Sequence, residues 1–325
     1  MRPLASLPTA SSSPAIVPIV SLKTVVSPSR RLEINALAAV SIVLGGVMLA
    51  AQQEPTFRAA TQTVSIYATV TDPEGRLVPD LTRDDFEVLD NDRPQPLTVF
   101  ENGNQPITVA LMRDMSGSML PARDLTDAAV KQFIASLRTD DRACYGVFGG
   151  SVLVNRRLTS DHSQLLAALS TPVPAFREGT ALWDAVSVGM QLVGGQPGRR
   201  VVVAMTDGGE NRSTTDVATL EATIVRDEIM FYMLGLTTRP GTQDPPRDLK
   251  RAAAVASNTG GGYFYVRPGD DLTAAFQRVS DELHHQYLLG FAPVTMDGRV
   301  HKLDVRMKRG DLKARSRKSY LAADK

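Results

Sequence analysis

The sequence is poor in the residues on which many enzymes and nucleic-acid-binding proteins depend. Its 325 residues include one cysteine, four histidines and one tryptophan, and only 6% are aromatic. A single cysteine excludes an intramolecular disulfide, and with it a disulfide-stabilised scaffold. The formal net charge is +1, and no long basic block is present. Nucleic acid is therefore not the expected partner, because its recognition needs a clustered basic face.

Motifs of the common hydrolases are also missing. There is no G-x-x-x-x-G-K-[ST] loop to support nucleotide hydrolysis and no G-x-S-x-G nucleophile elbow. A serine hydrolase would also need a histidine base beside its nucleophile. His162, His284, His285 and His301 fall at helix ends or in a distal β segment, so we interpret them as solvated or structural. We therefore do not expect an enzyme.

A long membrane-spanning run is missing, but the N-terminal region contains a shorter apolar one. Residues 1–29 are rich in serine and proline, a composition that cannot form a core. Arg30 and Arg31 then precede Ala36–Ala51, which has no charge and ends in small residues. This order is typical of a secretory signal peptide. We expect an exported protein, secreted or periplasmic. The alternative is membrane association through an uncleaved segment at 32–51, although a spanning helix needs about 20 apolar residues.

The rest of the chain has the composition of a globular protein, 43% hydrophobic and 22% charged, and its length suits about two domains. In residues 61–104, Val64, Ile66, Ala68 and Val70 fall on one face with the period of two that is typical of a half-buried strand. Two more strand-like runs follow. No helical period comes before residue 107.

Between residues 106 and 286, apolar runs alternate with helical stretches. Runs such as Val201–Met205 are apolar throughout, as in strands buried on both faces of a parallel sheet. We therefore predict an α/β fold, with a doubly wound, mostly parallel sheet and helices on both faces. Ligands of such sheets bind outside the carboxyl ends of the strands, near the switch in strand order.

The β pattern returns after residue 286, where Val300, Leu303, Val305 and Met307 suggest strands around a turn. Isolated units of two or three strands are marginally stable. We therefore predict that the two β segments form one small β-sandwich, with the α/β domain inserted between its halves. The predicted parts are a tail with signal peptide or anchor (1–53), two sandwich segments (54–105 and 287–325) and the α/β domain (106–286).

Polar oxygens follow the buried strands of the predicted sheet. In "ITVALMRDMSGSML", an apolar run ends at Asp114, and Ser116 and Ser118 follow at alternate positions. Another buried strand ends at Asp207, and Thr180 precedes a helix between the two. Carboxylate and hydroxyl oxygens suit Mg²⁺ or Mn²⁺, with Ca²⁺ possible, and soft metal ligands are missing. Two carboxylates would just neutralise a divalent ion and leave it able to accept an anionic ligand.

These segments resemble the von Willebrand factor type A family and its metal-ion-dependent adhesion site. The residues that carry the resemblance are "DMSGS" at 114–118, "GTALWDA" at 179–185 and "TDG" at 206–208. The flanking β segments resemble an exported bacterial subgroup related to this family. The resemblance implies that the metal is held by Asp114, Ser116, Ser118, Thr180 and Asp207, and that a protein partner completes the site with an aspartate or glutamate. Arg113 departs from the usual pattern and would lower cation affinity if it pointed toward the site.

Other readings of these residues stay open. The metal could only stabilise the loops of a structural scaffold or assembly subunit. A haloacid dehalogenase-like phosphatase is the enzyme alternative, but it needs an acid where Ser116 stands. Glu210, Asn211 and Arg212 follow Asp207 and could contact a partner or form a solvated loop. Trp183 could line the binding face, although packing against the sheet is the simpler interpretation.

Overall fold

The computed structural model describes residues 63–323, except for 104, 174–175, 177–178 and 238–244. The predicted signal peptide or anchor at 1–53 lies outside the described residues. Within the described part, no helix is both long and apolar enough to cross a membrane.

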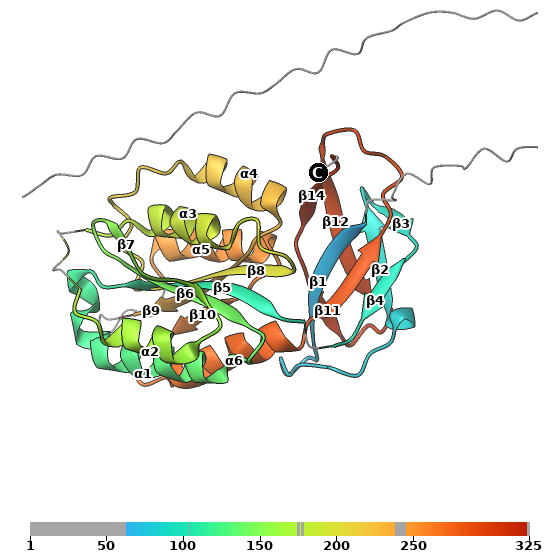
Figure 1. Cartoon of the computed structure of the whole chain (residues 1–325). Helices are drawn as coiled ribbons and strands as arrows, with labels where there is room; N and C mark the ends of the chain where they lie inside the picture. The colour runs from blue at the N-terminus through green and yellow to red at the C-terminus, as the bar shows by residue number, and fades with distance from the viewer. Residues whose placement is uncertain (1–62, 104, 174–175, 177–178, 238–244, 324–325) are drawn as a thin grey trace, which may run out of the picture. The chain divides into compact units, whose positions relative to one another are not determined.

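A six-stranded sheet forms the centre of the α/β domain, with the strand order β10-β9-β8-β5-β6-β7 (Figure 1). Its strands are β5 (Ile107–Asp114), β6 (Arg142–Phe148), β7 (Val152–Thr159), β8 (Arg199–Thr206), β9 (Met230–Leu236) and β10 (Tyr263–Val266). Every neighbouring pair is parallel except β6 and β7. From β5 the chain moves outward through β6 and β7 and then returns to β8 on the other side. The strand order therefore switches between β5 and β8.

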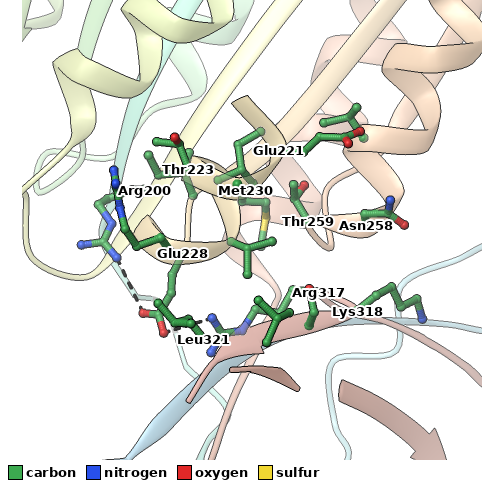
Figure 2. A pocket seen from close by; sticks show the side chains of 18 of the residues that line it. Arg200, Glu221, Thr223, Glu228, Met230, Asn258, Thr259, Arg317, Lys318 and Leu321 are labelled. Atoms are coloured by element: carbon green, nitrogen blue, oxygen red, sulfur yellow. Dashed lines mark ion pairs between the residues drawn. The ribbon is translucent and has the colours of Figure 1, made fainter. Parts of the chain in front are cut away.

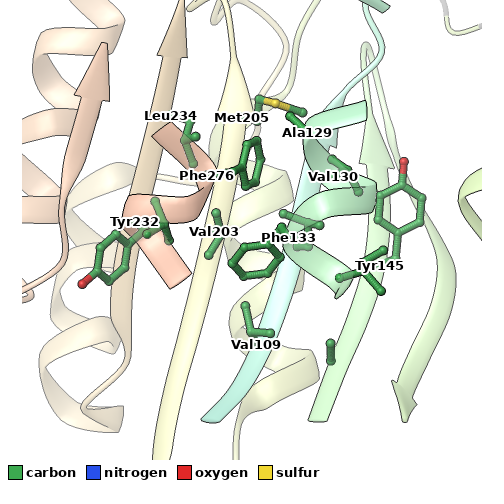
Figure 3. Packing of buried hydrophobic residues seen from close by; sticks show 14 of the residues in the cluster. Val109, Ala129, Val130, Phe133, Tyr145, Val203, Met205, Tyr232, Leu234 and Phe276 are labelled. Carbon is green, nitrogen blue, oxygen red and sulfur yellow. The ribbon is translucent and has the colours of Figure 1, made fainter. Parts of the chain in front are cut away.

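Three helices cover each face of this sheet (Figure 1). One face carries α1 (Arg123–Ser136), α2 (His162–Ser170) and α6 (Leu272–His284), and the other carries α3 (Leu182–Val193), α4 (Val217–Asp227) and α5 (Arg247–Asn258). A short 3-10 helix, η2 (Gly117–Ala122), leads into α1. On the first face, Phe133 of α1 and Phe276 of α6 contact each other with ring centroids 5.6 Å apart (Figure 3). Because both faces are covered, β5 is buried along its whole length. The predicted doubly wound fold is confirmed.

Two four-stranded antiparallel sheets form the β-sandwich, in the orders β13-β1-β11-β4 and β14-β12-β2-β3. The N-terminal segment supplies β1 (Val64–Thr71), η1 (Arg83–Asp85), β2 (Phe86–Asp90), β3 (Arg93–Gln95) and β4 (Val99–Glu101). The C-terminal segment supplies β11 (Tyr287–Phe291), β12 (Val300–Met307), β13 (Lys313–Arg315) and β14 (Ser319–Leu321). Each sheet contains two strands from each segment, and the two sheets share one apolar core. The predicted insertion of the α/β domain into a sandwich is therefore confirmed.

Strand β12 buries alternate residues. Val300 is 60% exposed, whereas His301, Leu303 and Val305 are buried. A period of two puts residues 301, 303 and 305 on the inner face and leaves Val300 on the outer face. His301 is accepted in the core because its Nδ1 lies 2.8 Å from Asp90 Oδ1. The structural interpretation of this histidine is confirmed.

A buried polar network joins the beginning and the end of the inserted domain. Arg199 donates to the side-chain oxygen of Gln286 at 2.9 Å and to the carbonyl oxygen of Gln105 at 3.0 Å. The Gln286 amide in turn donates to Thr69 Oγ1 of β1 at 2.9 Å. These contacts hold the entry and exit segments of the insertion beside the sandwich.

Candidate metal centre

Asp114 ends β5 at the switch point, where β5 pairs with β8. Its side chain is buried, with only 1% of the residue exposed. One carboxylate oxygen accepts a hydrogen bond from the backbone N–H of Ser116 at 2.7 Å, and the other accepts one from the Thr206 hydroxyl at the end of β8. The carboxylate is therefore held in place from both strands.

Burial governs the protonation of Asp114. Loss of solvent raises the pKa of this carboxyl from 3.8 to about 6, although hydrogen bonds from Thr206 and Ser116 oppose the rise. The nearby charge of Asp207 raises it further. A cation placed here would relieve both unfavourable effects, because it stabilises the ionised form of a buried acid. The electrostatics of the site thus favour a bound cation.

A chain of hydrogen bonds connects three more of the expected ligands. The hydroxyl oxygens of Ser116 and Ser118 lie 3.2 Å apart, and the Ser118 hydroxyl donates to Asp207 Oδ1 at 3.1 Å. Ser118 belongs to η2, whereas Asp207 follows β8, so the contact crosses the switch point. The structure therefore brings Asp114, Ser116, Ser118 and Asp207 into one cluster.

Thr180 is attached to the loop that follows Asp207. Its backbone N–H donates to the Asn211 side-chain oxygen at 3.0 Å, and its carbonyl accepts from the N–H groups of Asn211 and Arg212, each at 3.1 Å. The Thr180 hydroxyl faces the same loop, since a Cβ added to Gly209 would lie 3.5 Å from it. These contacts place the fifth expected ligand at the same edge of the sheet.

Gly179 allows this attachment. It has a φ of +100°, which L-residues with a side chain rarely adopt. A Cβ at this position would lie 2.5 Å from both Arg212 Cγ and Asn211 Oδ1. Glycine is therefore required both by the backbone conformation and by the close approach of the loop.

The four residues for which a partner contact was the alternative interpretation have other contacts in the structure. Trp183, in the first turn of α3, is 4% exposed and packs in the core on this face of the sheet, which confirms the packing interpretation and leaves its side chain little surface for a partner. Glu210 accepts from the N–H groups of Trp183 and Ser213, and Asn211 holds Thr180. Both side chains thus shape the loop itself. Arg212 is exposed, with its side chain beside Gly179.

Arg113 points away from the cluster. Its guanidinium pairs with Asp127 and donates to Thr126 Oγ1 at 2.7 Å and to the Arg123 carbonyl oxygen at 2.9 Å. All three partners belong to α1, on the opposite side of the strand from Asp114. The condition under which Arg113 would weaken cation binding is not met.

The cluster has the composition of a site for a hard cation. Among the described residues, no group of three or more histidine, cysteine or acidic side chains could hold a metal. The only cysteine, Cys144, is buried, and burial raises the pKa of its thiol to about 12, so it is not a ready ligand. Two carboxylates and three hydroxyls remain, an oxygen-only set that suits Mg²⁺, Mn²⁺ or Ca²⁺. The residues present therefore fit such an ion.

Two further residues support the site and were not singled out from the sequence. Thr206 binds Asp114, and its oxygen also accepts from the N–H of Gly208 at 3.0 Å. Asp184, in the first turn of α3, accepts from the N–H groups of Thr214 and Thr215 at 3.0 and 2.8 Å. Both lie inside the quoted motifs "TDG" and "GTALWDA". Their positions in the motifs were visible, but their hydrogen-bond partners were not.

The part of the chain that carries this cluster matches a known protein family. Residues 109–210 match the family described as von Willebrand factor type A domain. Such domains generally bind protein ligands, often through a metal-ion-dependent adhesion site, and are usually non-catalytic. No curated protein matches the chain.

Solved structures that match the chain include two bacterial proteins and one protein of the mussel byssus. The conserved hypothetical protein BatB from Bacteroides thetaiotaomicron is 21% identical, with 55% of this chain and 97% of that chain covered and a TM-score of 0.44. An aerotolerance-related membrane protein from Bacteroides fragilis is 22% identical over 55% and 98% of the two chains, with a TM-score of 0.45. Proximal thread matrix protein 1, with a zinc-occupied adhesion motif, is 15% identical over 58% and 48%, with a TM-score of 0.48.

Proposed function

We propose that this chain is an exported, non-enzymatic binding protein whose type A domain captures a protein partner through a divalent cation. Asp114, Ser116, Ser118, Thr180 and Asp207 would hold the ion directly or through water. An aspartate or glutamate of the partner would complete its coordination. Mg²⁺ is the preferred ion, with Mn²⁺ or Ca²⁺ as alternatives.

The observation that carries the proposal is the hydrogen-bonded cluster at the switch point. Four of the five proposed ligands are joined through the contacts of Ser116 with Asp114 and of Ser118 with Asp207. Side chains that converge in this way need little rearrangement to surround an ion, and this lowers the entropic cost of binding. Ser118 is exposed, so the cluster is open to solvent and to a partner on one side.

The charge of the cluster favours an acidic partner. Asp114 and Asp207 together neutralise a divalent ion, and the other three proposed ligands are neutral hydroxyls. When bound, the ion would supply a Lewis-acidic position for an external carboxylate. The protein's own residues would orient that position: Thr206 fixes the Asp114 carboxylate, and Asn211 fixes the segment of Thr180.

The export part of the proposal depends on the N-terminal sequence. Arg30 and Arg31 precede the uncharged run Ala36–Ala51, the order found in secretory signals. We place the chain with exported bacterial proteins of the type A family, either released or held at the membrane through residues 32–51.

Calorimetric titration of Mg²⁺, Mn²⁺ and Ca²⁺ into the purified protein tests the metal site. We expect saturable binding of at least one ion, reduced at least tenfold in both Asp114→Ala and Asp207→Ala, because each change removes half of the charge of the site. Asp140→Ala is the matched control, since Asp140 is an exposed acid outside the cluster. Wild-type affinity in both cluster variants would refute the site.

A second titration separates a recognition site from a purely structural metal. The Mn²⁺-loaded protein is titrated with a short peptide that contains one glutamate and, in parallel, with its glutamine counterpart, while water proton relaxation is followed. We expect only the glutamate peptide to displace metal-bound water and to lower the relaxation rate. Equal effects of the two peptides would contradict partner capture. The remaining interpretation would be a metal that only stabilises the loops.

A further inference from the structure

A groove runs along β10, the last strand at one end of the large sheet. It has a volume of about 570 Å³ and is lined by all four residues of β10, by the segment that leads into α6 and by part of that helix. The sandwich contributes Thr71, Gly75 and Arg315, and Arg315 is already paired with Glu282. The metal cluster lies at the ends of β5 and β8. The proposed metal-dependent function therefore does not use this groove.

The backbone of β10 is hydrogen-bonded on one side only. The Gly262 carbonyl accepts from the Met233 N–H at 2.9 Å, and the Val266 carbonyl accepts from the residue that follows β9 at 3.1 Å. The even-numbered residues of β10 thus face β9, and the backbone groups of Tyr263 and Tyr265 point to the outer side. Within the described part of the chain, nothing is hydrogen-bonded to these outward groups. An unpaired strand edge of this kind accepts a further strand.

A larger groove, of about 980 Å³ between α4 and the sandwich, differs from this edge. Its walls are joined by ion pairs of Glu228 with Arg317 at 3.0 Å and with Arg200 at 3.8 Å (Figure 2). Next to β14, the Lys318 N–H donates to the Asn258 carbonyl at 2.9 Å. The protein's own residues thus already use the charges and the backbone groups of that groove.

Charges of opposite sign lie in order along the groove beside β10. Asp270 and Asp271 follow the strand, and each accepts a hydrogen bond from a backbone N–H of its own segment. Arg278 lies about two turns further along α6, is exposed, and stands over the Phe264 ring at 5.7 Å from its centroid. Among the described residues, no ion pair involves any of these three charged side chains. The groove therefore complements a ligand with a basic group followed by an acidic one.

The two faces of β10 would contact different side chains of an added strand. The rings of Tyr263 and Tyr265 stack at 6.4 Å and pack on the face of α5, whereas Phe264 packs on the face of α6. Residues directly opposite each other in an antiparallel pair have side chains on the same face. Residues opposite the two tyrosines would therefore be apolar, because aromatic and β-branched side chains pair well. The residue opposite Phe264 would meet Arg278, and the one opposite Val266 would meet the two aspartates.

We propose that the edge of β10 binds an extended segment of another protein with the order basic, apolar, acidic, apolar, which pairs antiparallel with Tyr263–Val266. The apolar residues exchange backbone hydrogen bonds with the two tyrosines and cover their rings. The acidic residue faces Arg278, and the basic residue faces the two aspartates. The antiparallel direction is favoured because parallel pairing is slightly less stable per residue. Main-chain hydrogen bonds supply the affinity, and the alternate side chains supply the specificity.

The probe is the acetylated and amidated peptide Thr-Lys-Val-Glu-Val-Thr, labelled with a fluorophore and titrated against the full chain. We expect saturable binding in fluorescence anisotropy, at least fivefold weaker when the lysine and the glutamate of the peptide are exchanged. Arg278→Glu should weaken binding of the probe at least fivefold and restore it for a peptide with lysine in place of glutamate. Arg251→Glu is the matched control, because Arg251 is an exposed arginine of α5 outside the groove, and it should bind the probe like wild type.

Methylation of single peptide nitrogens tests the strand pairing itself. N-methylation of the first valine removes the N–H that pairs with the Tyr265 carbonyl, and should weaken binding at least fivefold. N-methylation of the glutamate removes an N–H that points away from β10, and should have little effect. The proposal is overturned if the probe fails to saturate, if the exchanged peptide binds equally well, or if the two methylated peptides bind alike. Dimerisation of the free protein that the probe reverses would also overturn it, and would assign this edge to a second copy of the chain.

Discussion

At the residue scale, Gly179 sets the position of Thr180. A Gly179→Ala variant would have to accommodate a Cβ 2.5 Å from Asn211 Oδ1 in a backbone with a φ of +100°. The loop after β8 would move away, and with it the contacts that hold Thr180. We expect the affinity for the divalent cation to fall at least tenfold, measured by the calorimetric titration described above.

The control for this variant is Gly195→Ala. Gly195 also has a positive φ, +70°, but a Cβ there would meet nothing within 4 Å. Both substitutions carry the conformational cost of about 1 kcal/mol that L-residues pay in this region. Only Gly179→Ala should affect cation binding. An equal loss in the two variants would show that strain, and not the close approach of the loop, is responsible.

The metal site also shows how far single residues could be interpreted from the sequence. The five oxygen donors were predicted from their spacing and from the family resemblance, and the structure brings them to one edge. The role of Thr206 could not be predicted, because its bond to Asp114 joins residues 92 positions apart. The same holds for Asn211, for which a partner contact and a solvated loop were both open, and whose side chain accepts a hydrogen bond from the Thr180 N–H. Hydrogen bonds between distant loops leave no periodic pattern in a sequence.

At the scale of secondary-structure elements, Asp141 joins β5, the loop after α1 and helix α6. Its buried carboxylate accepts from the N–H of Ile107 at 2.9 Å, from the N–H of Arg138 at 2.7 Å and from His284 Nε2 at 2.8 Å. Burial raises the pKa of Asp141, but the hydrogen bonds from His284, Arg138 and Ile107 outweigh it, and the net pKa lies below the usual 3.8.

A depressed folded-state pKa makes Asp141 stabilising only while it is ionised. Its contribution to the free energy of unfolding is complete at pH values above its pKa in the unfolded state, about 4. This contribution is lost as the pH falls through its lower pKa in the folded state. Asp141→Asn should lower the free energy of unfolding at pH 7 by about 2 kcal/mol, because an amide cannot accept all three bonds. In urea titrations, the difference from wild type should shrink below pH 4. Asp140→Asn, at the exposed neighbour, should show no such difference, and a constant gap at all pH values would contradict this account.

The elements themselves were largely predictable, and their ends were not. Alternation of buried strands and helices identified the α/β domain because its core faces repeat with regular periods. Helix α3 begins at Leu182, since the backbone of Thr180 is bonded to the loop at Asn211 and Arg212 and not to the helix. Helix α6 ends at His284, and Gln286 turns away to contact β1. Tertiary contacts decided both boundaries.

At the scale of the whole molecule, the inserted domain and the sandwich share a partly buried ion pair. Arg315 of β13 pairs with Glu282 of α6, and the Tyr232 hydroxyl donates to the same carboxylate at 3.1 Å. Arg315→Gln would leave the Glu282 carboxylate, which is 9% exposed, without its cation. We expect a loss of about 3 kcal/mol in the free energy of unfolding, because an unpaired buried charge is costly.

The double variant Glu282→Gln/Arg315→Gln tests whether the ion pair stabilises the protein through its charges or through the packing of its side chains. Removing both charges should recover part of the stability in thermal unfolding, since no buried ion then remains unpaired. Lys313→Gln, at an exposed position of the same strand, should unfold like wild type. If the double variant is no more stable than Arg315→Gln alone, the pair does not act through its charge.

The arrangement of the sandwich also determines the order in which the chain can fold during its synthesis. Asp90 must wait for His301, which follows 211 residues later, before the second sheet can close. At about 5 to 20 residues per second, this delay is roughly 10 to 40 s. During that time the first strands have nothing to cover their apolar faces, whereas the α/β domain is already complete as its own last helix emerges. At that stage the chain would carry a folded central domain and an unfinished sandwich, and the early strands would depend on chaperones until the second sandwich segment is made.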